Sequence, residues 1–193
     1  MPQHQSLDQV PKQDLMYTGY KKCHGMKYQA IVVPNGLIAH LSGPFHAPQN
    51  DHGVLNESNL LSQLESHAIQ PGSQQNDPPE RHYFQVYGDS AYGVSPVMIG
   101  PYLNAQPQSL EEGAWNMVMG GVRISVEHGF GMVLRDWPNL NCFWQQWVWG
   151  TMCGTMYCVS ILLSNAHACL VQNQTSHRYN CLPPTLDEYF HVN

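Results

Sequence analysis

The chain has 193 residues, of which 42% are hydrophobic and 11% are charged, with a formal net charge of −6. Enough apolar residues are present to build one sizeable core, and the low charge content also argues against intrinsic disorder. The acidic balance argues against a stand-alone nucleic-acid-binding domain, because such domains usually present a basic face. Half of the Lys and Arg residues lie between Lys12 and Lys27, so the only basic concentration is in the first segment.

The six cysteines are spread irregularly along the chain, and the first residues do not have the pattern of a secretory signal. Free thiols in a reducing compartment are therefore expected, in a protein that is not secreted.

The N-terminal elements begin after a polar lead-in at residues 1–16, which precedes a single domain over residues 17–193. Two apolar runs, 28–33 and 37–41, are joined by Pro34-Asn35-Gly36. Asn-Gly between strand formers predicts an antiparallel hairpin with a tight turn, in which both residues adopt positive φ.

The middle of the chain alternates periodic and irregular segments. Residues 56–67 place Leu60, Leu61 and Leu64 at helical spacing, which predicts a surface helix. A loop rich in Pro and Gly follows at 70–80. Residues 81–87 are rich in aromatic and β-branched side chains and predict a strand that ends at Gly88-Asp89.

The C-terminal half begins with an irregular stretch at 96–112 and is then mainly helical. Residues 115–134 predict a helix whose apolar stripe consists of Trp115, Val118, Met119, Val122, Val126, Phe130 and Val133. After a tryptophan-rich connection, residues 152–171 predict a second long helix. Polar residues interrupt it, so a buried helix is favoured over a membrane span. Thr185-Leu186-Asp187-Glu188 has the capping-box form that starts a short helix.

Two acidic residues stand in settings that suit metal binding, Asp89 at a strand end and Glu127 on a helix flank. Paired carboxylates of this kind suggest divalent-metal phosphodiester chemistry. Two plainer interpretations stay open. Asp89 is also a typical turn-forming residue ahead of Ser90, and Glu127 can form an ion pair with Arg123 on an exposed helix face.

Eight separate short segments follow one another along the chain: 17–30, 34–38, 43–44, 50–51, 88–92 (Gly-Asp-Ser-Ala-Tyr), 122–131 (Val-Arg-Ile-Ser-Val-Glu-His-Gly-Phe-Gly), 162–170 and 183–189. Together they resemble the nuclease domain of Harbinger-type DDE transposases, and the last two resemble fungal members. The resemblance covers most of the chain from Tyr17 onward.

The resemblance implies an α/β, RNase H-like fold, in which helices flank a mixed sheet and three acidic residues bind two Mg²⁺ or Mn²⁺ ions. Such metals activate a water or a DNA 3′-hydroxyl and stabilise the leaving oxygen. Asp89 matches the second catalytic Asp of the family and Glu127 its third acid. Asp51 matches a recurrent Asp after the hairpin, and either supports the metal ligands or forms a turn. DNA is the implied partner and the nucleus the implied location.

The chain departs from the family at the first acid. That residue belongs to an Ile-Asp-Gly-Thr-like strand, which would lie just before Met1 and would be the central strand of the sheet. Asp8 and Asp14 lie in a polar segment without strand character and do not replace it. The helix-turn-helix region of the family is also not found. We therefore expect an N-terminally truncated, catalytically incomplete DDE endonuclease that binds DNA weakly on its own.

Two alternatives from other functional classes remain. The first is a transposon-derived module without catalytic activity that binds a protein partner. The second is a structural zinc protein with Cys153, Cys158, His167 and Cys169 as ligands, although their spacing does not match paired CxxC motifs.

Overall fold

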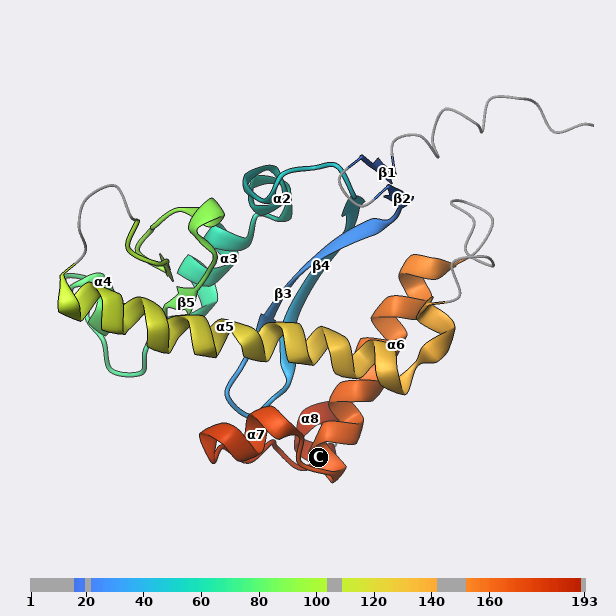
Figure 1. Cartoon of the computed structure of the whole chain (residues 1–193). Helices are drawn as coiled ribbons and strands as arrows, with labels where there is room; N and C mark the ends of the chain where they lie inside the picture. Colours follow the sequence, from blue (N-terminus) through green and yellow to red (C-terminus); the bar gives the residue numbers. More distant parts are fainter. Residues whose placement is uncertain (1–15, 20–21, 104–108, 142–151, 192–193) are drawn as a thin grey trace, which may run out of the picture.

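The computed structural model describes residues 16–19, 22–103, 109–141 and 152–191, and these form a mixed α/β structure (Figure 1). The strands are β1 (Tyr17–Thr18), β2 (Cys23–His24), β3 (Met26–Val32), β4 (Ile38–His46), β5 (Val86–Tyr87) and β6 (Met98–Ile99). Within the described residues they form three two-stranded sheets: β1 with β2 and β3 with β4, both antiparallel, and β5 with β6, which is parallel. The single mixed sheet implied by the resemblance is thus not formed by this part of the chain.

The predicted hairpin is confirmed as β3 and β4, although both strands extend further than expected. Its turn differs from the prediction, because only Gly36 has positive φ (83°) and Asn35 does not. Val33 N donates to Leu37 O, so three residues connect the strands, with Gly in the position that needs a left-handed backbone. The Asn35 side chain instead accepts a hydrogen bond from Leu37 N.

The helices are α2 (Asp51–Ser58), α3 (Leu60–His67), α4 (Pro79–His82), α5 (Leu110–Asp136), α6 (Cys153–Leu170), α7 (Gln174–Tyr179) and α8 (Leu186–Phe190). The single helix predicted over 56–67 is wrong in its bounds. Helix α2 begins at Asp51, where the Asn50 side chain accepts a hydrogen bond from Gly53 N. Asn59, with φ at 53°, then ends α2 and separates it from α3.

The strand predicted over 81–87 is also wrong in most of its length. Pro79 at the first helical position favours the one-turn helix α4, because its fixed φ suits a helix start. Only Val86 and Tyr87 form a strand, β5, which pairs with Met98 and Ile99 of β6. Strand β6 lies in a stretch for which no regular structure was predicted.

Helix α5 crosses the β3–β4 hairpin and begins five residues before the prediction (Figure 1). The cause is a capping box, in which the Ser109 side chain accepts from Glu112 N and the Glu112 side chain accepts from Ser109 N. The predicted stripe is buried only in part, because Trp115 and Val118 are exposed.

Small residues on the buried line of α5 let it approach the hairpin closely. Ser125, Gly129 and Val133 are its buried residues, and a Cβ at Gly129 would lie 3.4 Å from Val32 Cγ2.

Helices α6 and α8 confirm the predictions for these segments, whereas α7 was not predicted. Helix α6 packs on β4, α5 and α8. The Asn165 side chain links α6 to the hairpin through two hydrogen bonds. It accepts one from Ile38 N (3.0 Å) and donates one to Ile38 O (2.9 Å). The expectation that α6 is a buried helix holds for this face only, because its other face is exposed. Within the described ranges, α6 is the one helix long and apolar enough to cross a membrane by length and composition alone.

Two apolar clusters lie on opposite faces of the hairpin, because successive strand residues point to opposite sides. Ala30 and Val32 pack on the first cluster, which comprises Ile38, Val133 and Ile161 from β4, α5 and α6. Ile31 packs on the second, which comprises Leu55, Leu60 and Met98 from α2, α3 and β6. The second cluster fixes the β5–β6 pair, and with it the position of Asp89.

Candidate functional site

Asp89 follows β5 and caps the short 3₁₀ helix η2 (Ser90–Tyr92). Its Oδ1 atom accepts hydrogen bonds from Ala91 N (3.3 Å) and Ser90 Oγ (3.0 Å). The interpretation of Asp89 as a turn-forming residue is therefore confirmed. Its other oxygen, Oδ2, is not used by the turn and accepts a hydrogen bond from Arg123 (3.0 Å).

Glu127 lies in the middle of α5, with 62% of its side chain exposed. Its Oε1 atom is 3.5 Å from Nη2 of Arg123, one helical turn earlier, so the interpretation as an ion pair on the helix surface is also confirmed. A pair this exposed contributes little to stability.

Arg123 connects the two candidate acids. Its Nη1 donates to Asp89 and its Nη2 faces Glu127, so carboxylates from a strand end and from the middle of a helix meet at one guanidinium. Asp89 thus forms its turn and Glu127 its ion pair while both carboxylates contact the same arginine. We call Asp89, Arg123 and Glu127 the acid cluster. Sequence reasoning assigned Arg123 to Glu127 alone and missed its contact with Asp89.

The electrostatics of the acid cluster favour an ionised Asp89. Partial burial opposes ionisation, but the hydrogen bonds from Ala91 and Ser90, together with Arg123, lower the pKa of the Asp89 carboxyl below its ordinary value. Tyr87 lies beside the cluster, and burial raises the pKa of its hydroxyl while Arg123 lowers it. A carboxylate that stays charged is the form that binds a metal ion.

Asp51 is the first residue of α2, and its Oδ1 accepts a hydrogen bond from Lys27 Nζ (3.0 Å). The same ammonium group donates to Gln49 O (2.6 Å), which ties β3 to the start of α2. Tyr92, in η2, is affected by the charges of both Asp51 and Asp89. Burial raises the pKa of its hydroxyl, a hydrogen bond from Gln29 lowers it, and both acids raise it further. Helix α2, which begins with Asp51, contacts η2, but Asp51 has a cationic partner of its own, Lys27.

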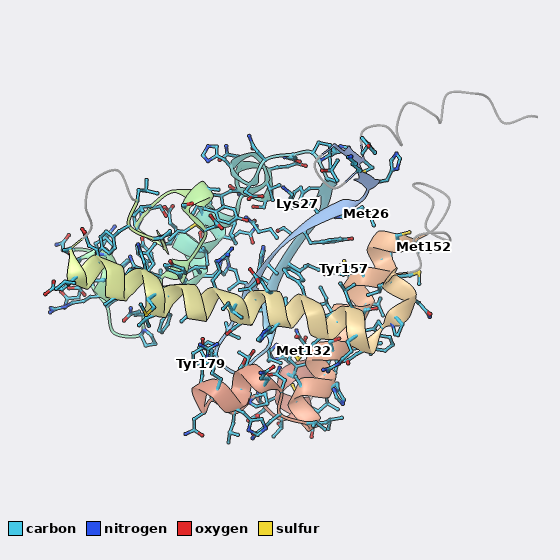
Figure 2. The ribbon with its side chains drawn as sticks, viewed as in Figure 1. Met26, Lys27, Met132, Met152, Tyr157 and Tyr179 are labelled. Carbon is cyan, nitrogen blue, oxygen red and sulfur yellow. The ribbon has the colours of Figure 1, made fainter. Side chains whose placement is uncertain are left out.

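An open groove of about 920 Å³ lies beside these residues. Lys27 and Asp51 line it, as does Ala91 two residues after Asp89. Figure 2 shows Lys27 at the start of β3 and Tyr157 on α6, which line the groove from different elements. The aromatic rings of Tyr28 and Tyr157 lie 4.3 Å apart on this side of the hairpin. Asp89, Arg123 and Glu127 themselves do not line this groove.

The donor atoms of the acid cluster suit Mg²⁺ or Mn²⁺, since both ions prefer carboxylate oxygens and keep several waters. Among the described residues, no three His, Cys, Asp or Glu side chains form a group that could hold a metal ion. This applies to Cys153, Cys158, His167 and Cys169, the suggested zinc ligands. Asp8 and Asp14 lie outside the described residues.

A family model described as DDE superfamily endonuclease matches residues 3–165, which include Asp51, Asp89 and Glu127. Neither the search of curated proteins nor the search of solved structures gave a match. Members of this family act on DNA and in general use divalent metals, so the match suggests a transposase-type nuclease function. With most of its length covered by this model, the chain belongs to the DDE superfamily endonuclease family.

Proposed function

We propose that this chain is a Harbinger-type nuclease domain, similar to fungal members and related to the RNase H fold, whose acid cluster binds Mg²⁺ or Mn²⁺. The observation that carries this proposal is the contact of Asp89 and Glu127 with the same arginine. Two carboxylates held this close need a positive charge between them, and Arg123 supplies it in the present arrangement.

Asp89 Oδ2 and Glu127 Oε1 are the atoms that would hold the metal, because the Asp89 turn already uses Oδ1. The bound ion would supply Lewis-acid activation of a water or a 3′-hydroxyl at a DNA phosphodiester. Arg123 would then turn away from the carboxylates. Its planar guanidinium is suited to contacting a phosphate oxygen of the DNA backbone.

We infer that this chain does not cleave DNA on its own. In the described part of the molecule, no third carboxylate joins Asp89 and Glu127, and Asp51 is bound to Lys27. We infer weak metal binding without turnover, weak contact with DNA, and a nuclear location that follows from the family's substrate. Cleavage of supercoiled plasmid in Mn²⁺ that disappears in Asp89→Asn would contradict the inferred inactivity.

Calorimetric titration with Mn²⁺ tests the metal site. The wild type should give saturable heat, and Asp89→Asn should weaken binding at least tenfold because one ligand loses its charge. Asp77→Asn is the matched control, since Asp77 is likewise a turn residue whose carboxylate accepts a backbone N–H, from Gln74 at 2.7 Å. Equal heats in the wild type and in Asp89→Asn would rule out the site.

A second candidate function is that of a protein-interaction module without catalytic activity. The exposed apolar face of α6 favours it, because soluble surfaces rarely leave so many large apolar side chains uncovered on one helix. A defined partner bound by a chain that gives no heat with Mn²⁺ would support this candidate over the metal site.

A further inference from the structure

Strand β3 has the burial of an inner strand but the pairing of an edge strand. All seven of its residues, Met26–Val32, are half-buried or buried, whereas its partner β4 has four exposed residues. Among the described residues, β4 is the only strand paired with it, and no other hydrogen bond reaches the backbone of Met26–Val32. The second edge of β3 therefore carries peptide N–H and C=O groups that are partly withdrawn from water and have no partner in the described chain.

The open groove of about 920 Å³ runs along the first residues of this strand. It is lined by Met26, Lys27 and Tyr28 of β3 and by an apolar wall from α5 and α6 that consists of Phe130, Leu134 and Tyr157 (Figure 2). Its charged residues are Lys27 and Asp51, which form an ion pair at 3.0 Å, so the groove has no net charge. It therefore suits an uncharged ligand with an apolar side better than a nucleic-acid backbone, which carries a charge at each phosphate.

A buried side chain of β3 also lacks a hydrogen-bond partner. Gln29 is 6% exposed, and its side chain hydrogen-bonds the Tyr92 hydroxyl, yet its Oε1 atom is buried with no partner among the described residues. Tyr28 and Gln29 are neighbours in the strand, so they point to opposite faces of it. Tyr28 stacks on Tyr157 of α6, whereas Gln29 faces η2. A ligand beside β3 would thus meet an apolar wall on one face and an unsatisfied acceptor on the other.

We propose that the groove binds an extended peptide segment of a partner protein, which adds to the free edge of β3 as a further strand. A peptide backbone repeats its N–H and C=O groups at the spacing of a strand edge, so this edge selects a polypeptide over other ligands. Alternate apolar side chains would pack on the wall of Phe130 and Leu134, and the intervening ones would carry hydroxyl or amide donors toward Gln29. The acid cluster does not line the groove, so peptide binding goes beyond the metal site and does not depend on it.

Fluorescence anisotropy of the full chain, without added metal, tests the proposal with a labelled peptide of about eight residues, the length of a long strand. Valine and threonine alternate in this peptide, and one lysine and one glutamate at its ends keep its net charge at zero. It should bind saturably. A peptide of the same composition in which all valines precede all threonines should bind roughly tenfold more weakly, because its apolar side chains fall on both faces. Absence of binding by the alternating peptide would overturn the proposal.

Methylation of backbone nitrogens separates main-chain pairing from side-chain contact. Successive N–H groups of a strand point to opposite edges, so N-methyl groups at the odd positions and at the even positions of the peptide block different edges. At least one of these two methylated peptides should bind roughly tenfold more weakly, because main-chain hydrogen bonds to β3 are lost. Hydrogen exchange should show new protection of amides within Met26–Val32 when the unmethylated peptide binds. Unchanged binding of both methylated peptides would overturn the strand pairing.

Leu134→Lys places a charge in the apolar wall and should weaken binding of the alternating peptide roughly tenfold. Val118→Lys is the matched control, because Val118 is 65% exposed on the same helix and does not line the groove. Circular dichroism checks the helix content of both variants, and the methylated peptides decide the question on the wild type if Leu134→Lys does not fold. Equal weakening by the two substitutions would overturn the proposal. Displacement of the peptide by a single-stranded oligothymidylate would assign the groove to nucleic acid and would also overturn it.

Discussion

At the scale of single residues, Arg123 forms an ion pair with each of the two candidate metal ligands, Asp89 and Glu127. Its two terminal nitrogens face Asp89 and Glu127, so the guanidinium occupies the side of each carboxylate that a metal ion would approach. Asp89 and Glu127, the two acids named from the resemblance, both contact this guanidinium. The contact between Arg123 and Asp89 could not be predicted, because helical spacing links Arg123 only to Glu127, and nothing in the local pattern indicates a contact 34 residues away.

Removal of Arg123 should strengthen metal binding. In Arg123→Ala the carboxylates lose a competing cation, so the affinity for Mn²⁺ should rise several-fold in calorimetric titration. Arg135→Ala is the control, because Arg135 lies on the same helix and binds Asp136 rather than the acid cluster. Unchanged or weaker Mn²⁺ binding in Arg123→Ala would show that the arginine is not a competitor for this site.

The protonation of Asp89 gives a second test at this scale. Because its pKa is lowered in the folded state, Asp89 contributes stability above the ordinary Asp pKa, and this contribution is lost as pH falls through the folded value. Carboxyl ¹³C NMR should show Asp89 titrating below an ordinary Asp. In Arg123→Ala the midpoint should move upward, although the hydrogen bonds from Ala91 and Ser90 remain. A midpoint unaffected by this substitution would contradict the described contact.

At the scale of elements, the sequence predicted the hairpin and both long helices but not their local limits. The start of α5 had a readable signal, since Ser109 and Glu112 have capping-box spacing. The break between α2 and α3 had a weaker sequence signal. Asn59 adopts a left-handed backbone there, but an Asn does so only occasionally, so its presence alone does not predict a break. In 81–87 a strand-like composition was overridden by the helix-starting Pro79.

The attachment of α6 to the hairpin depends on one side chain. Asn165→Ala would leave the N–H and C=O of buried Ile38 without their side-chain partner, so it should lower the free energy of unfolding by about 2–4 kcal/mol. Urea unfolding measures this. Asn116→Ala is the control, because Asn116 makes the same two-bond contact with Tyr102 at an exposed position and should cost less than about 1 kcal/mol. Similar losses in both variants would contradict the role of burial.

At the scale of the whole molecule, the α/β class was implied by the family resemblance and agrees with the mixed α/β structure, but the sheet arrangement differs from the implied one. A mixed sheet requires a strand that joins the β3–β4 hairpin to the β5–β6 pair, and no described segment takes that place. The exposed face of α6 was also missed. Its hydropathy alone indicates burial, and only the packing of Asn165 and Ile161 shows which side of the helix faces the core.

The net charge should make DNA binding by the chain alone weak. With a formal charge of −6, few phosphates can be neutralised, so we expect a dissociation constant for duplex DNA weaker than about 10⁻⁵ M at physiological salt. Fluorescence anisotropy with a labelled duplex measures it. Binding in the nanomolar range under these conditions would contradict the expectation.

The net charge of the acid cluster bears on the order in which a metal ion and DNA would bind. Two carboxylates and one guanidinium leave the cluster with one excess negative charge, which repels a phosphodiester. A single divalent cation would reverse this sign and leave one excess positive charge. The cluster would then attract the backbone that it previously repelled, so a metal ion is expected to bind first and the nucleic acid second.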